Sequence, residues 1–77
     1  SKYQKFLKES VKIYNKEELN PGDYVVHQDY GIGKYLGIRT RELRNTLNDY
    51  LCVEYADAST LYIPVENIYV LEISYPN

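Results

Sequence analysis

Few side chains in this chain of 77 residues could carry out catalysis or bind a metal ion. His27 is the only histidine and Cys52 is the only cysteine, and the serines and threonines that follow have no base near them in the sequence. Acid–base and nucleophilic catalysis need several such groups within hydrogen-bond distance of one another. We therefore expect no catalytic residue, no metal site and no cofactor. His27 is interpreted as a structural imidazole that hydrogen-bonds the backbone of the turn after it.

The glycine cluster over 31–37 could instead indicate a nucleotide-binding loop. A dinucleotide fingerprint needs a third glycine at position 36, where Leu36 stands, and a helix directly after it. A phosphate-binding loop needs glycine at position 28 and serine or threonine at position 35, where Gln28 and Tyr35 stand. Both nucleotide sites are excluded. The glycines are expected to permit a tight turn and, at Gly37, a β-bulge.

The stretch over 38–44 is the most informative one for function. Arg39, Arg41 and Leu43 are spaced two apart, so they project from one face of a strand. Arginine presents a rigid set of donors that suits carboxylates, and it is enriched at protein interfaces. Tyr62, on the outward face of a later strand, is a second candidate contact. The alternative interpretation of the arginines is a charged strand edge that prevents aggregation.

The elements that position these residues are expected to be short strands joined by tight turns. Residues 29–33 read as a tight connection, 45–48 as a hairpin connection and 57–59 as a turn, and a single helical turn begins at 66–67. Strands are predicted over residues 23–28, 34–44, 50–56, 60–65 and 68–73. This pattern predicts a mostly β fold, a small five-stranded SH3/Tudor-like barrel.

Residues 1–19 differ from the rest of the chain. Apolar residues at three- and four-residue steps predict a short amphipathic helix over 2–10, whereas the alternation over 11–14 also fits a strand. Pro21 and Gly22 end this segment. We expect residues 1–19 to be a leader from a preceding domain and residues 20–77 to be the barrel. The absence of methionine suggests a piece of a longer protein, with a cloning remnant at Ser1 as the alternative.

Composition narrows the classes of partner. Nine Lys and Arg against eleven Asp and Glu give a net charge of −2, which disfavours dense phosphate binding by DNA or RNA and favours a protein partner. Ten tyrosines exceed what so small a core can hold, so several must face water or a partner. No apolar run approaches the ~20 residues of a membrane span. The lone Cys52 excludes an internal disulfide and suits a reducing cytoplasm.

Several blocks of the sequence resemble one known family. The sequence resembles the RNA-polymerase-interacting domain of bacterial transcription-repair coupling factors, which CarD-type transcription regulators share. The blocks are in order and cover most of residues 19–71. They are Leu19–His27, Asp29–Ile38, Asp49–Leu51, Glu54–Ala56 and Leu61–Asn67. The glycines that this family often has near Arg44–Asn45 and Ala58–Ser59 are missing.

The resemblance implies a Tudor-like barrel that binds the β subunit of RNA polymerase by adding an edge strand to a strand of a β-subunit lobe. By position, the contacting residues would be Arg39, Thr40, Arg41, Glu42, Leu43 and Tyr62. The domain itself would catalyse nothing. It would tether an ATP-dependent DNA translocase, located elsewhere in a longer cytoplasmic bacterial protein, to a stalled polymerase so that the polymerase is removed and DNA repair is recruited. DNA would be contacted only through other domains.

Three other interpretations stay open at this point. Lys34, Arg39, Arg41 and Arg44 beside tyrosines would suit a nucleic-acid-binding small β-barrel of a CarD-type regulator, against the negative net charge. Converging tyrosine rings would form a Tudor-like cage for methylated side chains. An exposed edge strand would also permit self-association of two copies.

Overall fold

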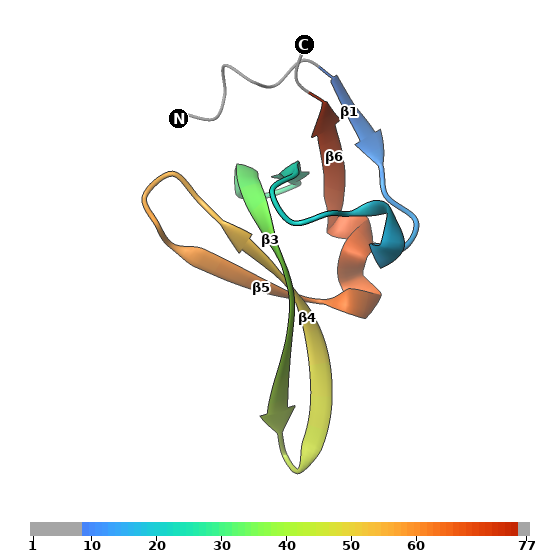
Figure 1. Ribbon diagram of the computed structural model, residues 1–77, viewed down its shortest axis with the longest axis vertical. Coiled ribbons are helices and arrows are strands. Elements are labelled where there is room, and N and C mark those ends of the chain that lie inside the picture. Colours follow the sequence, from blue (N-terminus) through green and yellow to red (C-terminus); the bar gives the residue numbers. More distant parts are fainter. Residues whose placement is uncertain (1–8, 76–77) are drawn as a thin grey trace.

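The computed structural model describes residues 9–75, which form a single sheet of six antiparallel strands. The spatial order of the strands is β1-β6-β2-β3-β4-β5. Figure 1 shows β1 beside β6 and the long β3–β4 pair. The elements in chain order are β1 (Glu9–Lys12), the 3-10 helix η2 (Lys16–Glu18), β2 (Tyr24–His27), β3 (Gly31–Leu43), β4 (Thr46–Glu54), β5 (Thr60–Pro64), the 3-10 helix η3 (Val65–Val70) and β6 (Leu71–Tyr75). The predicted mostly β fold is therefore confirmed.

The strands differ from a closed five-stranded barrel in two respects. A sixth strand, β1, pairs with the outer side of β6, from Glu9 opposite Tyr75 to Lys12 opposite Glu72. The terminal strands β1 and β5 do not pair with each other, so backbone hydrogen bonds do not close the sheet. The connection from β5 to β6 runs through η3, and Ile68 of this helix is buried in the core.

Several predicted boundaries are corrected by the structure; among them, the strands predicted over 23–28 and 50–56 are Tyr24–His27 and Thr46–Glu54. Residues 68–70 belong to η3, and the last strand covers Leu71–Tyr75. Strand β3 begins at Gly31, because the turn after β2 occupies only residues 28–30. The β3–β4 turn is Arg44–Asn45, shorter than the predicted 45–48, since Thr46 already pairs with Leu43. The predicted helix over 2–10 lies mostly outside the described residues, but residues 9 and 10 are in a strand.

The predicted β-bulge at Gly37 is confirmed. The β3–β4 register shifts between Tyr35, which pairs with Val53, and Gly37, which pairs with Cys52. The extra residue is Leu36, and Gly37 has a φ of +119°, a conformation that favours glycine. The bulge changes which side chains of β3 face the core, and therefore decides which face Arg39 and Arg41 occupy.

The core lies on the concave side of the sheet. It combines residues from β2, β3, β4, β5 and β6 with residues of the connecting segments. Ile13 and Leu19, which flank η2, are 4% and 6% exposed, so these two residues of the predicted leader pack in the core of the sheet. The buried apolar cluster consists of Ile13, Leu19, Val25, Tyr35, Leu51, Val53, Ile63, Ile68, Leu71 and Ile73. Whether residues 1–19 belong to a preceding domain stays a prediction.

His27 has the structural role predicted for it. Its side chain is buried, and its Nδ1 atom accepts hydrogen bonds from the backbone N–H groups of Asp29 at 2.9 Å and Tyr30 at 3.3 Å. Such bonds hold the β2–β3 turn in place of a backbone partner. The His27 ring also contacts the Tyr30 ring, with centroids 4.8 Å apart. The imidazole is therefore used to shape the turn.

Among residues 9–75, three non-glycine residues adopt positive φ, namely Arg44 at 54°, Asn45 at 64° and Ala58 at 70°. These are the places where the sequence lacks the glycines often seen in the family that it resembles. A left-handed conformation costs a non-glycine residue about 1–2 kcal/mol. Glycine avoids this steric cost, but part of the gain is lost because its unfolded backbone has more conformational entropy to lose on folding.

We expect Ala58→Gly to raise the free energy of unfolding by about 0.5–1 kcal/mol, because it removes this strain from the β4–β5 turn. Urea denaturation followed by circular dichroism measures the change. Ala56→Gly is the matched control, because Ala56 has no positive φ and glycine there should lower the stability. An equal loss of stability in both variants would contradict the strain at Ala58.

Candidate protein-binding site

The far half of β3, residues 38–43, is paired on one side only. Pairing between β2 and β3 ends with Tyr24 opposite Lys34, whereas pairing between β3 and β4 continues until Leu43 is opposite Thr46. The two strands therefore project from the rest of the sheet as a two-stranded ribbon (Figure 1). The ribbon lies along the long axis of the molecule, whose extents are 43 × 27 × 20 Å. Within residues 9–75, no strand pairs with the outer side of this ribbon at 38–43.

The two-residue turn determines which backbone groups face the unpaired side. Arg44 and Asn45 both have positive φ, as in a type I′ hairpin, in which the flanking residues Leu43 and Thr46 form a hydrogen-bonded pair. Hydrogen-bonded and non-hydrogen-bonded pairs alternate along an antiparallel ladder. The N–H and C=O groups of Thr40 and Glu42 consequently point away from β4, toward the unpaired edge.

Arg39 lies over the inner end of this edge. Its Nη1 atom donates a hydrogen bond of 3.2 Å to the carbonyl oxygen of Ile38, and the same atom lies above the bulge at Gly37. By the alternation of the ladder, the Ile38 carbonyl also points away from β4. The Arg39 guanidinium thus satisfies one acceptor of the edge, and leaves the groups of Thr40 and Glu42 as the ones available to another strand.

Arg41 extends across the sheet in the other direction. Its guanidinium carbon lies 5.0 Å from the centre of the Tyr62 ring, which is a cation–π contact between β3 and β5 over the intervening β4. Tyr62 is 41% exposed and pairs with the buried Cys52. The structure therefore brings together two of the predicted residues that stand 21 positions apart in the sequence.

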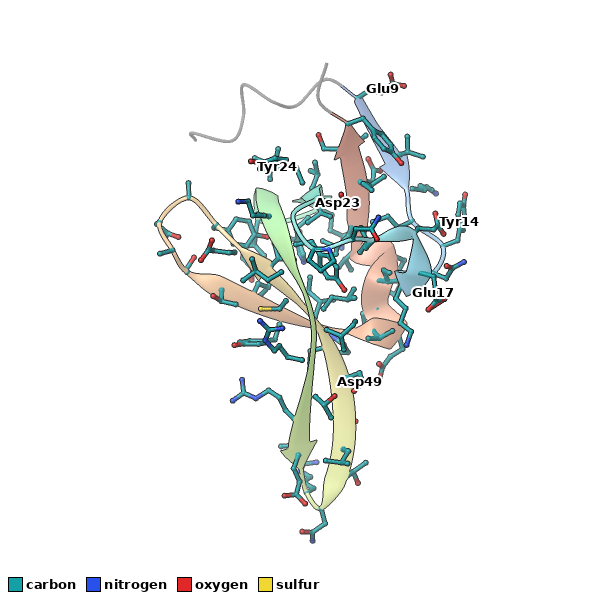
Figure 2. All side chains as sticks on the ribbon, in the orientation of Figure 1. Glu9, Tyr14, Glu17, Asp23, Tyr24 and Asp49 are labelled. Carbon is teal, nitrogen blue, oxygen red and sulfur yellow. The ribbon has the colours of Figure 1, made fainter. Side chains whose placement is uncertain are left out.

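The other face of the ribbon carries Thr40 and Glu42. The Thr40 hydroxyl donates a hydrogen bond of 2.7 Å to the carboxylate of Asp49, the residue directly opposite it on β4; Figure 2 shows Asp49 on the projecting ribbon. Leu43, at the end of the ribbon, is 56% exposed. Of the six predicted residues, five thus line one strand and the sixth, Tyr62, joins them through Arg41.

Burial beside the ribbon affects one phenol. Burial raises the pKa of Tyr35 above its usual value, the Cys52 thiol raises it further, and the Arg39 guanidinium opposes both. The guanidinium of Arg39 therefore lies within electrostatic reach of the core, while that of Arg41 lies over an exposed ring. The two arginines share a strand face but occupy different environments.

Comparison with known proteins identifies the family of this chain. Residues 19–74 match the CarD-like/TRCF RID domain family. The chain belongs to this family. The RID domain is 52% identical over 60 residues to the transcription-repair-coupling factor of Bacillus subtilis strain 168, a match that covers 78% of the chain and 5% of that protein. It is 37% identical over 67 residues to the factors of Staphylococcus epidermidis RP62A and Staphylococcus aureus USA300, covering 87% of the chain and 6% of each protein. The chain therefore spans about one-twentieth of the length of these relatives.

Sequence reasoning missed two features of the RID domain. The first is a second unpaired edge on the same ribbon, because β5 pairs only with residues Tyr50–Glu54 of β4, and among residues 9–75 no strand lies on that side of residues 46–49. Leu47 on this edge is 72% exposed. The second is a groove between the β2–β3 and β4–β5 turns. The β4 edge was missed because residues 45–48 are polar and are predicted to form a loop. The groove was missed because it is formed by two turns that are distant in sequence.

Residues 9–75 of the RID domain show no group of three or more His, Cys, Asp or Glu side chains able to hold a metal ion. None of the helices in this part is long and apolar enough to cross a membrane. The exposed side chains of the ribbon include Arg41, Leu43 and Leu47, and arginine is among the residue types enriched at protein interfaces.

Proposed function

We propose that this RID domain is a protein-binding module that tethers a transcription-repair-coupling factor to the β subunit of RNA polymerase by strand addition along β3. The observation that supports it is the unpaired edge at Thr40 and Glu42, whose backbone donors and acceptors point away from the sheet. An added strand would satisfy these groups and extend the sheet by one strand. The family to which the chain belongs supports RNA polymerase as the partner.

In this proposal the backbone contributes affinity and the side chains select the partner. Arg41, Leu43 and Tyr62 contact the partner on one face of the added strand, and Thr40 and Glu42 on the other. Arg39 would release the Ile38 carbonyl only if the partner strand extends that far. Electrostatic contacts of this type mainly accelerate association and fix the register, while the apolar contact at Leu43 slows dissociation.

The tether would have no catalytic activity of its own. We infer that the longer protein supplies an ATP-dependent DNA translocase, acts in the bacterial cytoplasm, and contacts DNA through its other domains. The role of the RID domain would be to raise the effective concentration of that motor at a stalled polymerase. Loss of polymerase binding by the RID domain should therefore abolish the action of the translocase on stalled polymerase without abolishing the translocase activity of the isolated motor.

The direct test is a calorimetric titration of the purified chain with a β-subunit lobe fragment. We expect saturable one-to-one binding that persists at physiological salt. A parallel anisotropy titration with duplex and single-stranded DNA tests the alternative of a nucleic-acid-binding barrel, for which Arg39, Arg41 and Arg44 gather on the ribbon. Binding to DNA alone, with no binding to the lobe, would replace the tether by that alternative. Light scattering of the free chain reports whether two copies associate.

A further inference from the structure

A groove of about 620 Å³ lies at the end of β4 opposite to the ribbon tip. Roughly 26 Å of strand separates the two ends of β4 at the usual rise per residue. The groove opens between the β2–β3 turn and the β4–β5 turn. Its main lining residues are Tyr30, Ile32, Tyr55, Asp57, Thr60 and Leu61. A ligand in this groove would leave the β3 edge at Thr40 free.

Backbone groups of β3 face the groove. Pairing of β3 with β4 stops at Lys34 opposite Glu54, so no described residue of β4 lies beside Ile32. The N–H of Tyr35 donates to the Asp23 carbonyl at 2.8 Å, on the side of β2. Because backbone groups alternate in direction along a strand, those of Ile32 point to the opposite side, where the groove lies. The groove therefore contains a short stretch of unpaired strand edge.

Two tyrosines form rigid aromatic walls. Tyr30 is 65% exposed, but its ring packs on His27, whose Nδ1 accepts the backbone N–H of Tyr30. Tyr55 packs directly over Gly33, where an added Cβ atom would lie 3.1 Å from the Tyr55 ring. Tyr30 and Tyr55 both line the groove, where burial raises the pKa of Tyr55 and the Tyr30 phenol raises it further. The Tyr55 hydroxyl is buried and has no hydrogen-bond partner among residues 9–75.

The charge of the groove is negative. Asp57 lines it, and hydrogen bonds from the Ser59 hydroxyl at 2.6 Å and the Ser59 N–H at 3.0 Å lower the pKa of this carboxyl. No lysine or arginine is among the lining residues that the structure describes. A carboxylate beside aromatic faces and aliphatic walls is the combination that binds an alkyl chain ending in a cation.

We propose that this groove binds an extended segment of a partner protein that inserts one lysine or arginine side chain. The backbone of the segment pairs with Ile32. The aliphatic part of the inserted side chain lies on Ile32 and Leu61, and its cationic end lies between the tyrosine rings and Asp57. The site is independent of the strand-addition edge, so the domain can hold a basic segment while it is bound to its tethering partner.

The test uses tripeptide probes and nitrogen-15 NMR of the whole chain. The probes are acetyl-Ser-Lys-Ser-amide, the same peptide with arginine, and the same peptide with uncharged norleucine. We expect millimolar binding of the lysine or arginine peptide that shifts the amides of Ile32, Tyr55 and Asp57. The norleucine peptide should bind at least fivefold more weakly, and added salt should reduce the difference.

Variants locate the site. Asp57→Asn keeps the acceptor for Ser59 but removes the charge, and Tyr30→Leu keeps an apolar wall but removes the ring; each should weaken the basic peptide at least threefold. Tyr69→Leu, at an exposed tyrosine outside the groove, is the matched control and should leave binding unchanged. Equal binding of norleucine and lysine peptides, or shifts confined to residues outside the groove, would overturn the proposal. Thr40→Pro should not affect these titrations, so failure of the groove and failure of the tether are separate results.

Discussion

Replacing Thr40 with proline is expected to lower the affinity of the RID domain for the polymerase β-subunit lobe about tenfold or more, because an acceptor left unpaired in the interface costs roughly 1–3 kcal/mol. Proline removes the N–H of Thr40, which points to the unpaired edge and makes no bond to β4. Proline is tolerated on strand edges of this kind, so the fold should persist. Calorimetry with the lobe fragment measures the loss, and circular dichroism confirms the fold.

Two further variants make this result specific. Thr40→Ala removes the hydroxyl that bonds Asp49 but keeps the N–H, so it should retain most of the affinity. Leu47→Pro places the same backbone change on the second unpaired edge, that of β4. Normal binding by Thr40→Pro together with a loss in Leu47→Pro would move the docking edge from β3 to β4. Normal binding by both would exclude strand addition on the ribbon.

Reversing the charge at Arg41 is the second change with a large expected effect. We expect Arg41→Glu to weaken lobe binding by about 2 kcal/mol or more, as at an interface hot spot, because it removes the guanidinium that stands over Tyr62 and puts a carboxylate in place of its hydrogen-bond donors at the proposed interface. Arg44→Glu makes the same change of net charge three residues away, in the turn, and should weaken binding far less. If both variants lost the same affinity for the lobe, Arg41 would contribute only through the net charge of the domain and not through a specific contact.

A double-mutant cycle separates the two residues of the contact. Tyr62→Phe keeps an aromatic face under Arg41, whereas Tyr62→Leu removes it. If the ring holds the guanidinium in place, Arg41→Ala and Tyr62→Leu should be non-additive by about 0.5–1 kcal/mol, the strength of an exposed cation–π contact, and Tyr62→Phe should bind nearly normally. Full additivity would mean that Tyr62 contacts the partner independently of Arg41.

The sequence alone determined most of the strand content and the local chemistry. Runs of β-branched and aromatic residues predict strands because such residues favour extended backbone. Gly, Pro, Asn and Asp mark the ends of these runs because they favour turns. The phase slip around Gly37 required an extra residue, and the bulge is there. His27 before a turn indicated a structural imidazole, and its Nδ1 bonds the turn. The strand content, the bulge and the role of His27 depend on residues within a few positions of one another, so they can be predicted from the sequence.

Only the tertiary structure decided which side of β3 is unpaired and which side chains meet there. Pairing of β2 ends at Lys34 while β4 continues to Leu43, and no local pattern in either strand specifies that difference. The contact of Arg41 with Tyr62 crosses an intervening strand, and the groove joins two turns of distant sequence. Strand order and register arise from packing of the whole core, a non-local free energy, whereas propensity and turn chemistry act residue by residue.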